Sequence, residues 1–305
     1  DQRFTTVYNG EIYNYKELAA ADDMQLRTGT DTEVLLECFA REKMPGDILA
    51  ECNGMWAFAM LDHRRRRLIL ARDRAGIKPL YHTTVDGNFY FASEIKTLIT
   101  LTGYKFRVNA AVVGAFIDQS LQDHVSDTFF EGVEHFKAGC WAEFDVQAPA
   151  NPPKYVPYWD PFSTAWSYDD PEETFRCLFE DAVKLRLRSD VPVGVTLSGG
   201  LDSSLITHAM TQQLPNVTAL SAVFPGTAQD ESRYVDIMAS RYDINVQKVT
   251  LDLNPANAFE LMHKATWHND TPLGSMSNVA FYLLMEQAHA LGVKVILSGQ
   301  GADEM

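Results

Sequence analysis

Short apolar runs and longer amphipathic segments alternate along the second half of the chain. Apolar runs that predict strands occupy residues 192–197, 217–224, 246–251 and 293–297. Segments that predict helices occupy residues 171–187, 203–214, 231–242, 255–266 and 278–290. Strands that alternate with helices in this way predict an α/β domain with a doubly wound parallel sheet.

The first half of the chain shows a different pattern, in which strands dominate. Apolar runs over residues 3–8, 55–61, 67–71 and 88–92 predict strands, and Asp86-Gly87 before the last run is a hairpin signal. Helices are expected near residues 31–42, with Thr30 or Asp31 as N-cap, and near residues 110–118. The mixture predicts an α+β domain in which antiparallel sheets pack on each other.

A proline-rich stretch at residues 148–161 separates the two patterns. Five of the 13 prolines lie between residues 149 and 161. Proline has no N–H for a sheet ladder, and it holds the preceding residue in an extended conformation, so the stretch predicts a stiff linker. We therefore expect a first domain over residues 1–148, a linker over 149–165 and a second domain over 166–305.

The charge balance limits the classes of partner. Apolar residues make up 46% of the 305 residues and charged residues 22%, an ordinary globular composition, and the net charge is −15. An acidic surface repels phosphate backbones and anionic lipids, so we expect neither a nucleic-acid nor a membrane partner. Small-molecule substrates are expected instead, and a homodimer stays open.

The four cysteines and the two chain ends add further expectations. Cys38, Cys52, Cys140 and Cys177 form no CxxC pair, which disfavours a structural zinc site and predicts reduced thiols in a cytoplasmic protein. The chain has no signal-peptide pattern and no initiator methionine, and it stops just after a strand-and-turn pattern. It is therefore expected to be an internal segment of a longer protein.

The sharpest chemical signal is the run SGGLDSS at residues 198–204, which follows the apolar strand ending at Leu197. Glycines let a turn approach a ligand closely, and the N-terminus of the next helix offers backbone N–H groups to an anion. Ser198 and Ser203 add hydroxyl groups, and Asp202 is suited to holding Mg²⁺ against phosphate oxygens. The alternative interpretation is a plain strand-to-helix turn with a serine N-cap.

A second strand end, SGQGADE at residues 298–304, has a similar construction. If both strands end at the same edge of the sheet, Asp202 and Asp303 lie close enough to share one Mg²⁺. The alternative is a glycine-rich turn capped by Asp303.

Asn9-Gly10, within YNGEIYN at residues 8–14, is ambiguous. One interpretation is an oxyanion hole made by the Asn9 amide and the Gly10 backbone N–H. Local propensity by itself favours an ordinary turn.

Taken together, the motifs resemble a known family. The run SGGLDSS is similar to the pyrophosphate loop of ATP pyrophosphatases. The whole set, in order, resembles glutamine-hydrolysing asparagine synthetase: residues 8–14 (YNGEIYN), 31–33 (DTE), 53–59 (NGMWAFA), 72–81 (RDRAGIKPLY), 91–96 (FASEIK), 198–204 and 298–304. The resemblance implies an N-terminal nucleophile hydrolase-like glutaminase domain followed by an ATP-pyrophosphatase-type synthetase domain. It further implies that aspartate is adenylated by ATP to β-aspartyl-AMP and then aminated by ammonia from glutamine, with release of AMP and pyrophosphate.

The resemblance also assigns roles to residues at matching positions. Asn9 and Gly10 would form the oxyanion hole, and Glu11 and Asp31 would hold the amino end of glutamine. ATP and pyrophosphate would contact a set of loop residues, and Mg²⁺ would bind Asp202 and Asp303. The loop residues are Leu197, Ser198, Gly199, Gly200, Ser203, Val223, Ser298 and Gly299.

Two departures from the family bear on activity. The family's glutaminase nucleophile is an N-terminal cysteine, and the four internal cysteines of this chain cannot replace it. Gln300 stands where some members have glutamate, and an amide cannot accept a proton as a carboxylate does. The sequence therefore leaves three hypotheses open: asparagine synthesis, an amide-forming ligase or amidotransferase for another carboxylate, and a nucleotide-binding module without catalysis.

Overall fold

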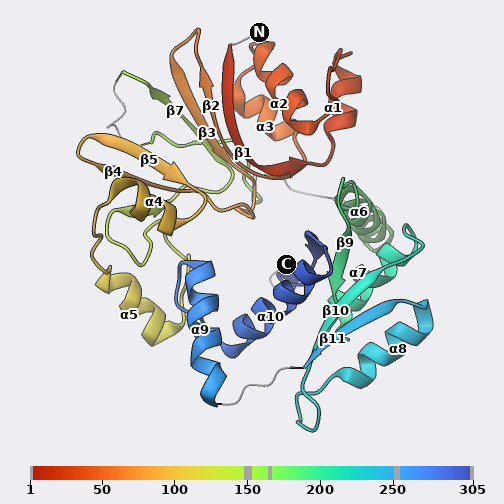
Figure 1. Ribbon diagram of the computed structural model, residues 1–305. Coiled ribbons are helices and arrows are strands. Elements are labelled where there is room, and N and C mark those ends of the chain that lie inside the picture. Colours follow the sequence, from red (N-terminus) through yellow and green to blue (C-terminus); the bar gives the residue numbers. More distant parts are fainter. Residues whose placement is uncertain (1–2, 148–152, 164–166, 251–254, 303–305) are drawn as a thin grey trace. The chain divides into compact units, whose positions relative to one another are not determined.

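The computed structural model describes residues 3–147, 153–163, 167–250 and 255–302. The chain divides into two units, Asp1–Trp166 and Ser167–Met305, which Figure 1 shows as ribbons. Each unit is described by itself below.

A five-stranded antiparallel sheet forms the centre of the first unit. Its strand order is β1 (Phe4–Ile12), β2 (Gly54–Asp62), β3 (Arg67–Arg72), β7 (Cys140–Asp145) and β8 (Val156–Pro157). A second sheet has the order β5 (Asn88–Ala92), β4 (Tyr81–Val85) and β6 (Val133–His135). The expected antiparallel sheets are therefore confirmed.

Alternation along β2 explains how the layers of the first unit are stacked. Trp56, Phe58 and Met60 enter a buried core with helices α2 (Asp31–Ala40) and α3 (Pro45–Glu51). Ala57 and Ala59 face the opposite way, into a core that includes side chains of the second sheet. Successive strand residues point to opposite faces, so a strand between two layers must be apolar on both sides.

Helix α4 (Ile95–Thr102) completes the stack on the second sheet. Its residues Ile95 and Leu98 are fully buried and pack in one cluster with Tyr81 and Val133. The layers of the first unit are therefore, in order, helices α2 and α3, the five-stranded sheet, the three-stranded sheet and helix α4. Two further helices are α1 (Tyr15–Ala21), which packs on α2, and α5 (Ala110–Gln119).

The RDRAGIKPLY segment forms a buried polar connection between β3 and β4. The Asp73 carboxylate is fully buried and accepts hydrogen bonds from the backbone N–H groups of Trp56 (3.2 Å), Ile77 (2.9 Å) and Lys78 (2.9 Å). The Arg72 guanidinium donates to three backbone carbonyl oxygens, each at 2.8 Å. Buried charges persist only where hydrogen bonds replace water, which gives this motif a structural role.

All seven predicted helices are present, with ends shifted by a few residues. Thr30 is the N-cap of α2, and its hydroxyl accepts a hydrogen bond from the Glu33 backbone N–H at 3.2 Å. The sequence did not predict α1, α3 and α4, which are only seven or eight residues long. Such short helices contain too few periodic positions to give a helical pattern.

Part of the predicted linker packs on the first unit. Strand β8 pairs with β7, and Pro157 is tolerated there because β8 is an edge strand. The Tyr155 hydroxyl lies 2.8 Å from His82 Nε2, and the Tyr158 hydroxyl donates to the Arg72 carbonyl oxygen at 2.7 Å. Side chains on both sides of Pro157 thus anchor this part of the predicted linker to the first unit, although its proline content predicted a spacer.

The second unit contains a four-stranded parallel sheet, as the alternating pattern predicted. The strand order is β11 (Asn245–Thr250), β10 (Thr218–Val223), β9 (Val193–Thr196) and β12 (Val295–Leu297). Helices α6 (Pro171–Arg186), α7 (Leu201–Thr211) and α8 (Ser232–Tyr242) contribute to the core on one face. Helix α10 (Met276–Ala290) packs on the other face, beside α9 (Pro255–Asn269), so the sheet is doubly wound.

No helix in the described ranges is both long and apolar enough to cross a membrane.

We predict that Gly54→Ala destabilises the first unit. A methyl group at this position would collide with the Glu11 carbonyl oxygen and lie 2.9 Å from Ile12 Cα, where β1 pairs with β2. Overpacking against backbone should lower the free energy of unfolding by about 1–3 kcal/mol. Gly114→Ala in α5 is the control, because open space surrounds it, and it should stabilise by about 0.5–1 kcal/mol. Urea titrations followed by tryptophan fluorescence measure both; equal stability of the two variants would contradict the prediction.

We also predict that His82 makes the first unit less stable in acid. Burial, followed by the nearby His135, lowers the pKa of His82 from 6.5 to about 4. Between these values the unfolded chain binds a proton that the folded chain does not, so stability is lost as the pH falls from 6.5 towards 4. His82→Gln should flatten this dependence by up to about 1.4 kcal/mol per pH unit. Urea titrations near neutral pH and in mild acid test it, and parallel slopes for wild type and variant would refute it.

Candidate functional site

The loop after β9 forms the tight turn that its glycines and serines predict. Gly199 has φ = +86°, and a Cβ there would lie 2.6 Å from Tyr234 Cβ, so a larger residue does not fit. The Ser198 hydroxyl accepts a hydrogen bond from the Gly200 backbone N–H at 3.2 Å and lies 3.0 Å from the Ser203 hydroxyl. Gly200 is the N-cap of α7, and no side chain caps this helix. The first backbone N–H groups of α7 therefore suit an anionic ligand.

The second loop lies directly against the first. Strand β12 pairs in parallel with β9, so both strands end at the same edge of the sheet. A Cβ added to Gly299 would lie 2.9 Å from Asp202 Cβ and 3.0 Å from the Ser203 backbone nitrogen. The expected proximity of the two loops is thus confirmed for the described residues, while Asp303, the second expected Mg²⁺ ligand, lies outside them.

A cavity of about 590 Å³ opens where the two loops meet. The predicted residues that line it are Leu197, Ser198, Gly200, Asp202, Ser203, Ser298 and Gly299. Two predicted residues do not line it: Gly199 faces Tyr234, and Val223 is buried. Because side chains alternate along β10, its neighbours Ala222 and Phe224 line the cavity instead.

The sequence pattern missed several residues of this cavity. Thr227, Gln229 and Glu231 come from the loop that joins β10 to α8, and Ser277 from the first turn of α10. The Asp230 carboxylate organises that loop by accepting hydrogen bonds from the backbone N–H groups of Phe224 and Ser232. The position of this loop could have predicted its role, because loops at the carboxyl ends of parallel strands line ligand sites.

The described carboxylates fit a cation held jointly with phosphate. Asp202 and Glu231 both line the cavity. Across the described residues, no group of three or more His, Cys, Asp or Glu side chains could hold a metal by themselves. Mg²⁺ bound to nucleotides takes one or two carboxylates and completes its shell with phosphate oxygens and water, and Asp202, in the first turn of α7, is a carboxylate of the kind this requires.

In the first unit, Asn9 and Gly10 lie within strand β1, paired with Ala57 and Trp56. The alternative interpretation of a turn is therefore wrong. Asn9 Nδ2 donates to the Ser93 hydroxyl at 3.2 Å, and both residues line a cavity of about 390 Å³. A Cβ on Gly10 would collide with the Met55 carbonyl oxygen, so close strand packing explains this glycine.

Asp31 is brought to the same strand by hydrogen bonds. Its Oδ2 atom accepts from the Tyr8 hydroxyl at 2.8 Å and from the Ile12 backbone N–H at 3.0 Å. Burial and the Asp31 carboxylate raise the pKa of Tyr8 far above its ordinary value, which keeps the phenol as a donor. Asp31 therefore lies beside the stretch that includes Asn9, Gly10 and the partly exposed Glu11.

None of the four cysteines has the environment of an activated nucleophile. All four are free thiols, and Cys38, Cys52 and Cys140 are buried. Burial raises the pKa of Cys38 to about 11 and that of Cys52 to about 12. A catalytic cysteine needs the opposite shift.

Comparison with known families matches both halves of the chain. Residues 1–159 match a glutamine amidotransferase domain, and residues 174–305 match an asparagine synthase domain. The first unit is an α+β fold with antiparallel sheets, and the second is an α/β fold with a doubly wound parallel sheet.

Individual relatives agree with the two domain matches. A Methanocaldococcus jannaschii protein named for glutamine-hydrolyzing asparagine synthetase is 34% identical, covering 98% of this chain and 58% of that protein. Asparagine synthetase 1 of Bacillus subtilis is 31% identical (100% and 48%), and the amidase chry2 of Gibberella zeae is 32% identical (98% and 46%). A solved structure, the B. subtilis glutamine phosphoribosylpyrophosphate amidotransferase with ADP and GMP, gives a TM-score of 0.37 at 14% identity, covering 84% of this chain and 50% of that one.

The chain spans about half the length of these curated relatives. The two domain matches occur in the order in which the sequence motifs appear, and together they cover nearly the whole chain. The chain therefore belongs to the asparagine synthetase family, with a glutamine amidotransferase domain followed by an asparagine synthase domain.

Proposed function

We propose that the protein is an ATP-dependent ligase that transfers the amide nitrogen of glutamine to a carboxylate acceptor, releasing AMP and pyrophosphate. Aspartate, activated as β-aspartyl-AMP and converted to asparagine, is the acceptor that the family resemblance predicts. The observation that carries the proposal is the contact of Gly299 with Asp202 and Ser203 at the mouth of one cavity.

That contact supports a cradle for a nucleoside triphosphate. The α7 N-terminus and the Ser198 and Ser203 hydroxyl groups would hold the β- and γ-phosphates. Asp202 would hold Mg²⁺, which offsets phosphate charge when bound. Phe224 and Ala222, at the end of β10, would pack against the base, where the family resemblance placed Val223.

The family resemblance predicts the chemistry at this cavity. An oxygen of the acceptor carboxylate attacks the α-phosphorus, the bond between that phosphorus and the bridging oxygen breaks, and pyrophosphate leaves with the electron pair. Backbone N–H groups stabilise the charge that develops on the leaving group. Ammonia then attacks the acyl carbon, AMP leaves, and a proton is lost from the new amide nitrogen.

The first unit would supply the ammonia. The Asn9 amide and the Gly10 backbone N–H would stabilise the oxyanion formed when a nucleophile attacks the glutamine amide. Glu11 and Asp31 would face the ammonium end of glutamine, where carboxylates are the natural partners. The Asn9–Ser93 hydrogen bond adds Ser93 as the residue that orients the Asn9 side chain.

Two other aspects of function stay proposals. A cytoplasmic location, small-molecule substrates and a homodimer are supported by composition and family resemblance alone. A nucleotide-binding module without catalysis is the weaker candidate, because Asp202 lines the cavity beside an intact phosphate loop.

A direct assay of the full-length protein tests the proposed ligase. With ATP, Mg²⁺, glutamine and a panel of carboxylic acids, we expect glutamate, AMP and pyrophosphate to appear in equal amounts with the true acceptor. Release of ADP and inorganic phosphate instead would overturn the adenylation chemistry, and the absence of any ATP cleavage would favour the binding module.

We predict that Asp202→Asn lowers AMP release by at least about 100-fold and raises the Mg²⁺ concentration needed for half-maximal rate. The variant keeps the size of the side chain but loses the negative charge that a divalent cation requires. Asp243→Asn is the matched control, because Asp243 lies at the C-cap of α8 in a left-handed conformation that asparagine also adopts. Near-normal turnover of Asp202→Asn would refute the metal-binding role.

A further inference from the structure

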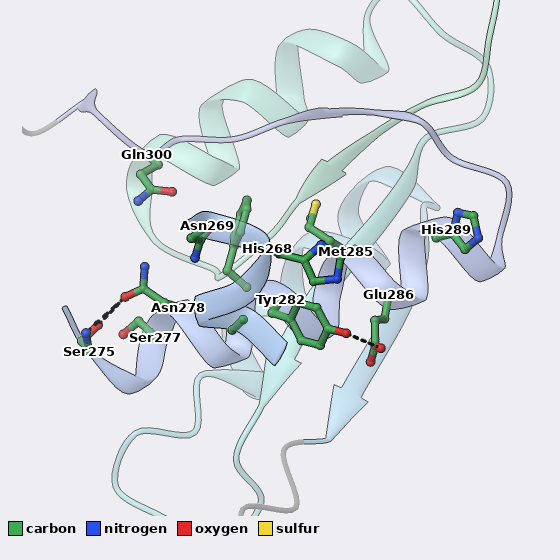
Figure 2. Close-up of a pocket in the computed structure, with 12 residues that line it drawn as sticks. His268, Asn269, Ser275, Ser277, Asn278, Tyr282, Met285, Glu286, His289 and Gln300 are labelled. Carbon is green, nitrogen blue, oxygen red and sulfur yellow. Dashed lines mark hydrogen bonds between the residues drawn. The ribbon is translucent and has the colours of Figure 1, made fainter. Parts of the chain in front are cut away.

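Besides the two glycine-rich loops, two further walls border the cavity that is proposed to hold ATP. One is the start of α10, where the cavity adjoins a larger one of about 930 Å³, because Ser277 and Gln300 line both (Figure 2). The other is the loop over residues 225–231, which joins β10 to α8. The first wall borders further open space, whereas the second is continuous with Phe224 at the end of β10.

The end of β10 reaches the cavity beyond the ladder that ties β10 to the strand of the phosphate loop. Strands β9 and β10 pair in register from Thr218 to Leu220, and the Leu197 backbone N–H donates to the Leu220 carbonyl oxygen at 2.8 Å. Strand β10 then continues to Val223 with β11 as its partner. Phe224 follows and lines the cavity. The distance between Phe224 and the phosphate loop is therefore not set by the pairing of β10 with β9.

One carboxylate oxygen joins the two ends of the loop over residues 225–231. Asp230 Oδ1 accepts hydrogen bonds from the Phe224 backbone N–H at 3.2 Å, from the Ser232 backbone N–H at 3.3 Å and from the Ser232 hydroxyl at 2.6 Å. Phe224 precedes the loop and Ser232 begins α8, so this oxygen holds both flanks of the loop. The hydrogen bond from the Ser232 hydroxyl lowers the pKa of Asp230, which keeps the acceptor negatively charged at neutral pH.

The start of α8 in turn packs on the phosphate loop. A Cβ added to Gly199 would lie 2.6 Å from Tyr234 Cβ and 3.2 Å from the Val235 backbone nitrogen. Val235 is fully buried in the core of the second unit, which fixes this part of α8. The start of α8 therefore contacts the phosphate loop and, through Asp230, also holds the Phe224 backbone.

We propose that Asp230 is a positioning residue that sets the spacing between Phe224 and the phosphate loop, and thereby the affinity for a ligand that spans both. The inference rests on the proposed nucleotide-binding function. Asp230 is not among the described residues that line the cavity, so it acts through Phe224 and α8 rather than by contact with the ligand. ATP would reach both places, whereas pyrophosphate would contact only the phosphate loop.

This difference between the two ligands separates positioning from two simpler roles. If Asp230 only stabilised the start of α8, its loss would affect ATP and pyrophosphate alike or affect neither. If only its charge mattered, removal of a carboxylate near the phosphates would strengthen the binding of both anions. Weaker binding of the nucleotide with unchanged binding of pyrophosphate is expected from the positioning role alone.

The test measures the binding of two probes to the full-length protein by isothermal titration calorimetry in the presence of Mg²⁺. The probes are α,β-methylene-ATP, which cannot be cleaved to AMP, and pyrophosphate. Asp230→Ala should raise Kd for the methylene analogue by at least about tenfold and leave Kd for pyrophosphate within about twofold of wild type. Asp230→Asn keeps an acceptor oxygen and should return Kd for the analogue to within about threefold of wild type.

Asp236→Ala is the matched control, because it removes the same charge from the same helix. Asp236 lies further along α8 and pairs with Lys248 at 2.6 Å on the surface, so both Kd values should stay unchanged. An unchanged Kd for the analogue in Asp230→Ala, equal losses for the two probes, or no recovery in Asp230→Asn would overturn the role of Asp230 and leave the ligase standing. A wild-type protein that binds neither probe would overturn the proposed nucleotide site as well.

Discussion

The parallel pairing of β9 with β12 is the constraint on which the cavity proposed to bind the nucleotide depends. Val195 is in register with Leu297, so the loops that begin at Ser198 and Ser298 leave the sheet at the same edge. Gly299 has no side chain, and this allows its backbone to rest against Asp202 and Ser203. Two segments about one hundred residues apart thereby line one cavity, together with Gly200 and Ser203 at the start of α7.

The electrostatics of this opening explain why a divalent cation belongs to the proposed reaction. The chain has a net charge of −15, and Asp202 and Glu231 both line the cavity. Phosphates in such a place gain from the helix N-terminus but are repelled by the two carboxylates. A bound Mg²⁺ would reverse the sign of the local field, so that the same carboxylates help to hold the nucleotide.

In the first unit, hydrogen bonds that stabilise the fold also position the proposed glutamine site. Asp31 begins α2 and accepts bonds from Tyr8 and from the backbone of Ile12, which fixes the helix against β1. Asn9 and Gly10 lie between those two contacts, in the strand that pairs with β2. The buried Asp73 holds the Trp56 backbone on the far side of β2. A change at any of these residues is expected to alter both stability and the geometry of the site.

The sequence by itself determined the two fold classes, the succession of strands and helices in the second half of the chain, and the loops that begin at Ser198 and Ser298. It could do so because periodicity, glycine and serine act locally. It could not place Asn9-Gly10 in a strand, because the pairing of nine residues with β2 outweighs the local turn propensity. Nor could it show that the proline-rich segment is anchored, because Tyr155 and Tyr158 contact residues distant in the sequence. Only the tertiary structure decided that Ala222 and Phe224 face the cavity while Val223 does not, since this depends on which face of β10 is covered. The tertiary structure also brought Ser277 of α10 and Gln300 of the loop after β12 to the same cavity, because strand and helix packing creates this proximity and no local pattern encodes it.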